Sequence, residues 1–358
     1  MGKTYRLLVI NPGSTSTKIA VFQNERQLFE KTIRHPAEEI KKYHTIYQQF
    51  DFRKEVILRI LKDNGIDPDG FDAVAARGGN MKPVTGGTYR VNGPMLDDLR
   101  RGVMGQHASN LAAPLAYDMA VKLGIPSYVV DPVIVDELDD LARFSGLPDI
   151  QRKAKDHPLN QRAAARQAAE ELGGEYGDFN FLVTHLGGGI SVGVHKRGKI
   201  VDVNNVLDGD GPFSPERAGG LPVGSLIDLC YSGKFTREEM RRKITGGGGL
   251  VAYLGTNDGR EVRKRVEKGD KYAEQVYRAM AYQISKEIAA GAAVLMGDVD
   301  AIVLTGGLAH DDMLVGWISQ RVSFIAGVMV YPGEFEMSAL AQGVLRVFRG
   351  EEEEKVYI

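Results

Sequence analysis

The chain has 358 residues, 43% hydrophobic and 26% charged, which is typical of a water-soluble protein of about two domains. Lysine and arginine number 45 against 47 aspartates and glutamates, so the net charge of -2 argues against broad attraction to nucleic acid or to an anionic membrane surface. The single cysteine, Cys230, excludes an internal disulfide and a multi-cysteine metal site, and we expect it to be a small core residue in a reducing compartment.

The N-terminal segment predicts a strand, a polar turn and a second strand. Apolar residues 7–10 lead into Asn11-Pro12-Gly13-Ser14-Thr15-Ser16-Thr17-Lys18, and residues 19–22 are again apolar. This turn gathers a carboxamide, four hydroxyls and an ammonium group, which are donors suited to an oxyanion; a plain polar β-turn is the alternative. With no signal-peptide pattern and no run of about 18 apolar residues, we expect a cytoplasmic protein without a membrane anchor.

Helical and strand patterns alternate through the next part of the chain. The spacing of apolar residues predicts helices over 52–63, 108–123 and 161–172. Short apolar runs at 73–76 and 127–130 predict strands of a covered sheet. This alternation indicates an α/β fold.

A second hairpin, over residues 181–194, repeats the plan of the first. Its turn reads His185-Leu186-Gly187-Gly188-Gly189-Ile190-Ser191 and follows an apolar strand. His185 therefore stands at a strand end beside three glycines, which leave room for a phosphate chain. Hydrogen bonding at the strand end is the alternative role for this histidine. Two hairpins of one plan indicate two similar domains.

The C-terminal third predicts a long helix over 273–296, a strand over 301–304 and a last helix over 337–348. The strand is followed by Thr305-Gly306-Gly307, a third glycine turn, which alone could be a simple connection. The acidic residues 351–354 are expected to form a solvated end.

Standard nucleotide motifs do not fit this sequence. The chain lacks the full G-x-x-x-x-G-K-[ST] pattern, and the loose dinucleotide fingerprint at 247–252 follows a helix-like segment where that motif requires a strand.

Three motifs in chain order carry a family resemblance: Asn11-x-Gly-Ser-Thr-Ser-x-Lys18, His185-x-Gly-x-Gly-x-Ser191 and Thr305-Gly306-Gly307. Together they resemble the acetate and butyrate kinase family of the actin, sugar-kinase and Hsp70 superfamily, and the resemblance spans the whole chain. Four further segments look more like butyrate kinases than acetate kinases: 76–79, 130–132, 157–163 and 331–334.

The resemblance implies a fold and an activity. The fold is α/β, with two similar ribonuclease-H-like or actin-like domains and a central cleft. We expect an acid- and phosphate-side domain of residues 1–152 with 338–358, and a nucleotide-binding domain of residues 153–337. The implied reaction is reversible transfer of the ATP γ-phosphoryl group to butyrate or a related short acid, giving an acyl phosphate and ADP with Mg²⁺, in a homodimer or larger homo-oligomer. Rival interpretations are an actin-like or Hsp70-like nucleotide-binding protein and a sugar kinase of the same fold.

The resemblance also assigns roles to individual positions. The first phosphate turn would comprise Asn11, Ser14, Ser16 and Lys18. His185 would contact the transferring phosphoryl group, and the glycines of the nucleotide side would be Gly187, Gly188, Gly189, Gly306 and Gly307.

Four further positions match less firmly. His107 matches a second histidine near the site, although it could cap a helix at Ala108. Asp131 matches an aspartate that orients other groups or the metal, although it could be a turn residue before proline. The magnesium-associated glutamate would be Glu334 or Glu336.

The arginines match only loosely. Acetate kinases have one arginine a few residues before His-Gly-Gly and another in Thr-Arg-x-Gly-Asp, whereas here the first triplet is Arg77-Gly78-Gly79 and residues 221–225 contain no arginine. Arg77 at a strand end is well placed for a guanidinium to meet a carboxylate or phosphate, with a surface salt bridge as the alternative. Arg217 is a second, weaker candidate.

Overall fold

The computed structural model describes residues 3–358, which divide into two compact units. Unit 1 contains the residues up to 136 together with 335–358, and unit 2 contains residues 137–334. The division expected from the sequence instead placed 137–152 in the first domain and 335–337 in the second.

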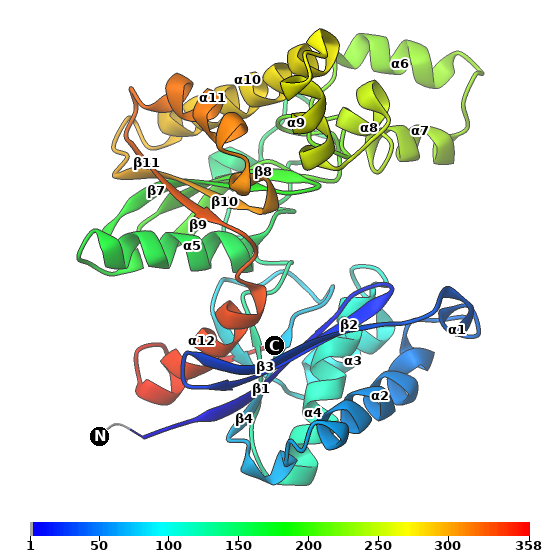
Figure 1. Cartoon of the computed structure of the whole chain (residues 1–358), viewed down its shortest axis with the longest axis vertical. Helices are drawn as coiled ribbons and strands as arrows, with labels where there is room; N and C mark the ends of the chain where they lie inside the picture. Colours follow the sequence, from blue (N-terminus) through cyan, green and yellow to red (C-terminus); the bar gives the residue numbers. More distant parts are fainter. Residues whose placement is uncertain (1–2) are drawn as a thin grey trace. The chain divides into compact units, whose positions relative to one another are not determined.

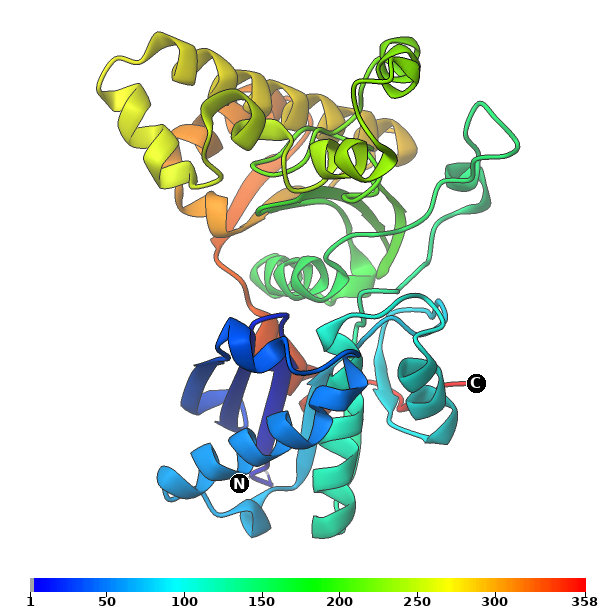
Figure 2. The same ribbon diagram turned by 90° about the vertical axis from the view of Figure 1, so that its right-hand side faces the viewer.

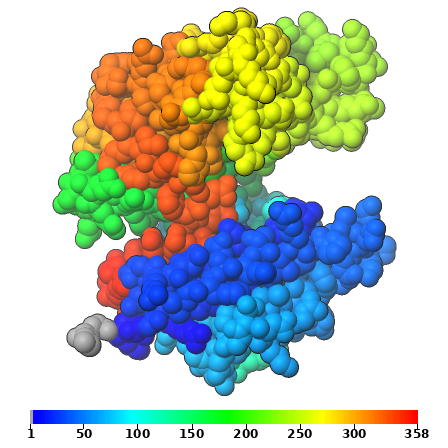
Figure 3. Space-filling model, in the orientation of Figure 1, coloured from blue at the N-terminus to red at the C-terminus, as the bar shows by residue number. Residues whose placement is uncertain are grey.

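Unit 1 is built on a seven-stranded mixed sheet in the order β12-β5-β6-β4-β1-β2-β3 (Figure 1). Strand β1 pairs antiparallel with β2 and parallel with β4, and β4 pairs parallel with β6. The strands are β1 (Arg6–Pro12), β2 (Ser16–Gln23), β3 (Arg26–Arg34), β4 (Ala73–Arg77), β5 (Thr88–Arg90), β6 (Ser127–Val130) and β12 (Lys355–Val356). Edge strand β3 carries exposed charged side chains, which oppose further strand pairing, and this blue segment is on the surface in Figure 3.

Helices cover both faces of this sheet. The helices of unit 1 are α1 (Ala37–Ile40), α2 (Phe50–Asp63), α3 (Gly93–Arg101), α4 (Ala112–Leu123) and α12 (Glu336–Arg349). Side chains of α2 and α4 share a core with alternate residues of β1 and β4, among them Leu8 and Val74. Helix α12 packs against β1, β4 and β6, which brings the C-terminal segment back onto the N-terminal sheet (Figure 1).

Unit 2 has a five-stranded sheet in the order β11-β10-β7-β8-β9. Its strands are β7 (Asn180–Leu186), β8 (Ile190–Lys196), β9 (Lys199–Val203), β10 (Ala301–Gly306) and β11 (Gly327–Pro332). The antiparallel run β7-β8-β9 has the same plan as β1-β2-β3, so the repeat expected from the two hairpins is present. Strand β10 pairs parallel with both β7 and β11.

The helices of unit 2 are α5 (Pro158–Glu171), α6 (Val223–Tyr231), α7 (Arg237–Ile244), α8 (Gly249–Leu254), α9 (Gly259–Glu267), α10 (Lys271–Val294) and α11 (Asp312–Val322). Helix α5 packs on β7 and β10 along one face of the sheet. On the other face, α10 and α11 form a core with residues such as Leu182 and Ile302 (Figure 2).

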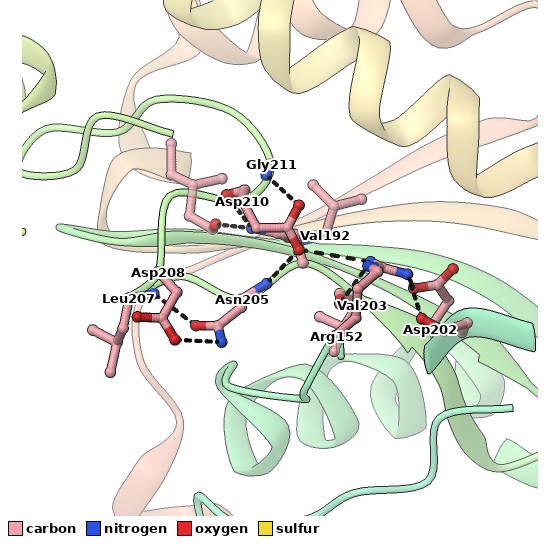
Figure 4. Close-up of polar contacts among 12 residues, drawn as sticks. Arg152, Val192, Asp202, Val203, Asn205, Leu207, Asp208, Asp210 and Gly211 are labelled. Atoms are coloured by element: carbon pink, nitrogen blue, oxygen red, sulfur yellow. Dashed lines mark hydrogen bonds and ion pairs between the residues drawn. The ribbon is translucent and has the colours of Figure 1, made fainter. Parts of the chain in front are cut away.

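An arginine ties the segment before α5 to strand β9 and the loop that follows it (Figure 4). Arg152 donates to Asp202 Oδ1 at 2.9 Å and to the Val203 carbonyl, and its second nitrogen lies 3.7 Å from Asp210. Asp210 in turn accepts from the backbone N–H of Asn205. These contacts fix the course of the loop 204–211 and have no counterpart among the motifs found in the sequence.

The structure corrects three local predictions. Residues 108–111 form a 3-10 turn (Ala108–Leu111) before α4, where the sequence predicted one continuous helix. Cys230 is exposed, because no residue of α6 is buried. The acidic tail is exposed at Glu351, Glu353 and Glu354, as expected, but Glu352 is partly buried: it accepts from the Thr88 N–H at 2.7 Å and pairs with Arg346.

Among residues 3–358, no helix is long and apolar enough to cross a membrane.

Candidate functional site

In unit 1, the predicted phosphate turn joins β1 to β2. The Gly13 N–H donates to the Ser16 carbonyl at 2.8 Å and closes a tight turn that carries Ser14 and Ser16. Lys18 lies further along β2, where its ammonium pairs with Glu30 of β3 at 3.3 Å. The structure thus places the hydroxyls on the turn and directs the Lys18 charge toward the edge strand.

Three predicted site residues of unit 1 are in direct contact. Asn11 ends β1, Arg77 ends β4, and Glu336 begins α12. Asn11 Nδ2 donates to Glu336 Oε2 at 2.7 Å, and Arg77 Nη1 lies 2.7 Å from Glu336 Oε1. A carboxylate in the first turn of a helix is stabilised by the positive end of the helix dipole. This cluster therefore holds a guanidinium, a carboxamide and a carboxylate together at the strand ends.

His107 and Asp131 both make the local contacts that the sequence allowed as alternatives. His107 is the N-cap of the 108–111 turn, and its Nδ1 accepts from the Ser109 N–H at 3.2 Å. Burial and the positive charges of Arg77 and Arg53 lower its pKa, so the ring is neutral at pH 7. Asp131 has a positive φ of 38° and accepts from the Gly87 N–H at 2.8 Å, which fixes the turn after β6.

In unit 2, His185 ends β7 and is held by residues of α5. Asn160 Nδ2 lies 2.9 Å from His185 Nδ1 and 3.2 Å from Thr305 Oγ1. Because a carboxamide nitrogen only donates, Nδ1 accepts, and the neutral ring carries its proton on Nε2. The His157 ring stacks on the His185 ring with centroids 3.9 Å apart.

A chain of buried hydrogen bonds leads to His157 from the far side of α5. Tyr176 OH lies 2.7 Å from His195 Nδ1, and His195 Nε2 lies 2.9 Å from Gln161 Oε1. Gln161 Nε2 donates to Ser191 Oγ at 2.7 Å, and Ser191 Oγ lies 2.9 Å from His157 Nδ1. Since Gln161 Oε1 can only accept, His195 donates through Nε2, and the bonds run in one direction from Tyr176 to Ser191.

His195 is neutral in this chain. Burial is the main cause that lowers its pKa well below the ordinary value, and the nearby charges of Arg162 and Arg166 act in the same direction. The directional network thus contains no charged group, and it leaves Nε2–H of His157 as that ring's donor whenever Ser191 donates to Nδ1.

A cavity of about 1000 Å³ opens beside the glycine turns of unit 2. Its lining includes Gly187, Gly188, Gly307, Arg260, Asp311 and Glu334. Pockets of this size accommodate nucleotide-sized ligands. Three of the five predicted nucleotide-side glycines therefore line a cavity large enough for ATP, and Glu334 shares that cavity.

The backbone just before Gly307 requires a glycine at position 306. Its φ is +92°, and a Cβ at this position would lie 2.5 Å from the Leu186 carbonyl oxygen. The turn after β10 therefore runs directly against the end of β7, which brings the Thr305 and His185 turns together.

Arg217, the second candidate arginine, is linked to the glycine turn of unit 2 through Glu216. Its Nη1 pairs with Glu216 Oε2 at 3.1 Å, and Asn257 Nδ2 donates to Glu216 Oε1 at 2.5 Å. The Glu216 N–H donates to the Gly188 carbonyl. Arg217 is thus partnered by a carboxylate beside the glycine turn.

Sequence reasoning missed His157, Asn160 and Gln161, although the segment 157–163 supported the family resemblance. They occupy positions i, i+3 and i+4 at the start of α5, directly around a proline at the first helical position. Residues so spaced share one face of a helix, and this signal could have predicted a polar helix face toward the sheet.

Comparison with known proteins identifies the family. Residues 152–330 match the acetate kinase model of the Acetokinase family. Butyrate kinase 2 of Clostridium acetobutylicum is 54% identical over 353 residues, which cover 99% of each chain. The chain belongs to the acetokinase family. This family consists of acid kinases, so the chain is an enzyme that phosphorylates a carboxyl group.

Solved structures confirm the predicted fold class. The acetate kinase of Porphyromonas gingivalis aligns with a TM-score of 0.76 at 20% identity, covering 96% of this chain and all of that one. A propionate kinase from Francisella tularensis gives 0.75 at 18% identity, over 95% and 98% of the chains. A ROK family protein from Streptococcus pneumoniae gives 0.54 at 11%, over 96% and 99%. The fold of this acetokinase family member is therefore the α/β, actin-like fold.

Proposed function

We propose that this enzyme is a butyrate kinase, which transfers the γ-phosphoryl group of ATP to butyrate or a similar short-chain acid. The observation that carries the proposal is the 54% identity to Butyrate kinase 2 over nearly the whole of both chains. The glycine-lined cavity and the anchored histidines of unit 2 support a nucleotide and phosphoryl site.

The chemistry requires no general base. A carboxylic acid with a pKa of about 4.3 is already ionised at pH 7. A carboxylate oxygen bonds to the γ-phosphorus while the bond to the bridging oxygen breaks, so that the electron pair of that bond leaves with ADP. Because the attacker and the phosphoryl group are both anionic, the enzyme must supply alignment and positive charge.

We assign the nucleotide to the cavity of unit 2, where Gly187, Gly188 and Gly307 allow close approach of the chain to the ligand. His185 would donate through Nε2–H to a phosphoryl oxygen, since Asn160 holds its Nδ1 as an acceptor.

On the acid side, Asn11, Ser14 and Ser16 would donate to the phosphoryl group, and Arg77 would meet the carboxylate. Asp131 and His107 would fix the neighbouring turns, in keeping with their backbone contacts. We leave Lys18 out of direct contact, because it pairs with Glu30.

Magnesium fits Glu336. Mg²⁺ usually binds through one or two carboxylates together with substrate phosphates, and Glu336 offers a hard oxygen donor held by Arg77 and Asn11. Among residues 3–358, no group of three or more histidine, cysteine or acidic side chains could form a protein cage, which agrees with this mode of binding. Once bound, the ion would neutralise charge on the phosphate oxygens.

We expect the enzyme to select only moderately among acids of different chain length. One methylene is worth about 0.8 kcal/mol of burial, and apolar pockets separate neighbouring homologues by roughly 10- to 200-fold. We therefore propose that propionate, isobutyrate and valerate are also substrates and that acetate is a poor one.

We further propose a cytoplasmic homodimer or larger homo-oligomer. The apolar helix α6 leaves Val223, Ile227 and Tyr231 exposed in the single chain, which supports burial against another chain. Light scattering coupled to size-exclusion chromatography measures the number of subunits. A monomer at micromolar concentration would contradict this assignment.

Trapping the acyl phosphate as its hydroxamate tests the function. The purified enzyme is incubated with ATP, Mg²⁺, hydroxylamine and a series of linear and branched acids. We expect hydroxamate to form best with acids of about four carbons. ATP hydrolysis independent of any acid would instead support a nucleotide-driven binding protein, and phosphorylation of a sugar would support a sugar kinase.

A further inference from the structure

Arg53 is the largest fully buried side chain of the protein, and no motif in the sequence pointed to it. It lies in the first turn of α2, and all five of its N–H groups have acceptors. Nε and Nη2 donate to Gln49 Oε1 at 3.1 and 2.9 Å. Nη1 donates to the Ser16 carbonyl at 2.9 Å and to Thr17 Oγ1 at 3.0 Å, and Nη2 donates to the Ser14 carbonyl at 3.2 Å.

Every one of these acceptors is neutral. Among residues 3–358, no carboxylate pairs with Arg53, although 0% of its surface is exposed. Burial lowers the pKa of its guanidinium to about 10, so the group still carries its charge at neutral pH. A buried cation with satisfied hydrogen bonds but no counter-charge is costly, because hydrogen bonding to neutral groups only partly replaces its hydration.

The location of this charge suggests what balances it. Three of the acceptors belong to the Ser14–Thr17 turn, so the guanidinium holds this turn in place by hydrogen bonds. The hydroxyls of the same turn are the ones assigned to the phosphoryl group. Its field extends to both neighbouring histidines, His35 and His107, whose pKa values it helps to lower. If Arg53 only held the turn in place, its hydrogen bonds would be needed but its unpaired charge would not.

We propose that Arg53 is a positioning residue that fixes the Ser14–Thr17 turn and whose unpaired charge attracts a phosphoryl anion to the outer side of that turn. The ligand class is a phosphate monoanion or dianion: the γ-phosphate, an acyl phosphate or inorganic phosphate. The reaction in which the bound anion takes part rests on the proposed function. The binding of the anion itself does not.

The substitution Gln49→Glu tests the charge of Arg53 separately from its hydrogen bonds to the turn. The substitution is nearly isosteric and keeps an acceptor at Oε1, but it places a carboxylate against Arg53 and cancels its charge. We expect the binding of inorganic phosphate, measured by titration calorimetry, to weaken roughly tenfold, as loss of one nearby unit charge at an intermediate dielectric implies. The melting temperature should stay the same or rise, because the buried cation gains a partner.

Gln27→Glu is the matched control. Gln27 is an exposed residue of β3 in the same unit, so this variant adds the same charge without approaching Arg53. It should bind phosphate as the wild type does.

The substitution Arg53→Lys keeps the charge but loses the planar guanidinium. It should retain phosphate binding within about threefold and lower kcat with butanoyl phosphate and ADP.

Unchanged phosphate binding in folded Gln49→Glu would overturn the proposal and leave Arg53 as a brace. Failure of that variant to fold would also count against it, since the idea requires an ion pair to be tolerated there. A wild type that binds phosphate but does not turn over butanoyl phosphate would contradict the proposed function alone, because the calorimetry does not depend on turnover.

Discussion

In unit 2, neighbouring polar side chains determine which ring nitrogen of a histidine carries the proton. His185 ends an apolar strand, but its proton is placed by Asn160, which donates to Nδ1 and so puts the proton of the neutral ring on Nε2. The stacked ring of His157 is oriented in turn by Ser191 and Gln161. Each imidazole therefore depends on an uncharged side chain for its tautomer.

Asn160→Asp should reverse that arrangement. A carboxylate accepts from Nδ1–H and favours the protonated ring, so Nε2–H is no longer the sole proton of a neutral imidazole. We expect kcat to fall by about tenfold or more, with a shift of the acidic limb of the kcat–pH profile and a KM for ATP within a few-fold of wild type. Gln167→Glu, an exposed change on the same helix, controls for added charge. Wild-type kcat and an unshifted profile would remove Asn160 from the mechanism.

Arg77→Lys tests the acid side. Lysine keeps the charge but loses the planar fork that contacts Glu336 and, in the proposed function, the substrate carboxylate. We expect about a tenfold lower kcat together with a higher KM for butyrate, measured by the hydroxamate assay. A defect confined to the KM for ATP would instead move the carboxylate role to another arginine, such as Arg217.

At the scale of elements, α12 shows how the C-terminal segment reaches unit 1. The helix lies against β6 where Gly343 leaves no room for a side chain: a Cβ would stand 2.4 Å from Val130 Cγ1 and 3.1 Å from Thr88 Oγ1. Because the β-branched Val130 has little rotamer freedom, the contact sets how closely the helix approaches the sheet. The position of Glu336, at the first residue of α12, follows from this packing.

Gly343→Ala should therefore destabilise the protein by about 1–3 kcal/mol through overpacking. Gly316→Ala in α11 is the matched control, since a Cβ there meets nothing within 4 Å. The control should gain about 0.5–1 kcal/mol from helix propensity and lower chain entropy. Urea unfolding of both variants measures the two free energies, and equal effects would contradict the close packing of α12 on β6.

At the scale of the whole molecule, each unit has its own core, and each buries histidines in the neutral form. In unit 1, burial and then the charge of Arg53 lower the pKa of His35 to about 4; in unit 2, burial lowers the pKa of His195 well below its ordinary value. Unfolded histidine has a pKa of about 6.5, so below that pH the unfolded chain binds protons that the folded chain does not. Stability must then fall as the pH falls.

His35→Gln should remove part of this acid sensitivity. Glutamine can replace the contact between His35 Nε2 and Thr17 Oγ1 but does not titrate. Between pH 6.5 and about 4, the free energy of unfolding of the wild type should fall relative to the variant by about 1.4 kcal/mol per pH unit, with no difference in slope above pH 7. Denaturant unfolding at pH 7.5, 6 and 5 measures the two slopes. Parallel slopes throughout would mean that the pKa of His35 is the same in the folded and the unfolded chain.

The sequence by itself determined the two hairpins, the helices flanking them, the glycine turns and the family. These features are local: alternation of apolar residues, proline and glycine at turns, and helical spacing act within about ten residues. The sequence also named Asn11, Arg77 and Glu336 as site candidates, but their contact with one another was not predicted.

Only the tertiary structure decided which side chains are buried and what they touch. Arg53 and His195 look like surface residues in a polar pattern, yet both are fully buried because segments distant in the chain supply their acceptors. Cys230 is exposed and Glu352 is partly buried, against expectation, for the same reason: burial depends on which element packs opposite, and hydrophobicity alone does not specify that partner. The tautomers of His157 and His185 likewise depend on hydrogen bonds between α5 and the sheet, which form only when the chain has folded.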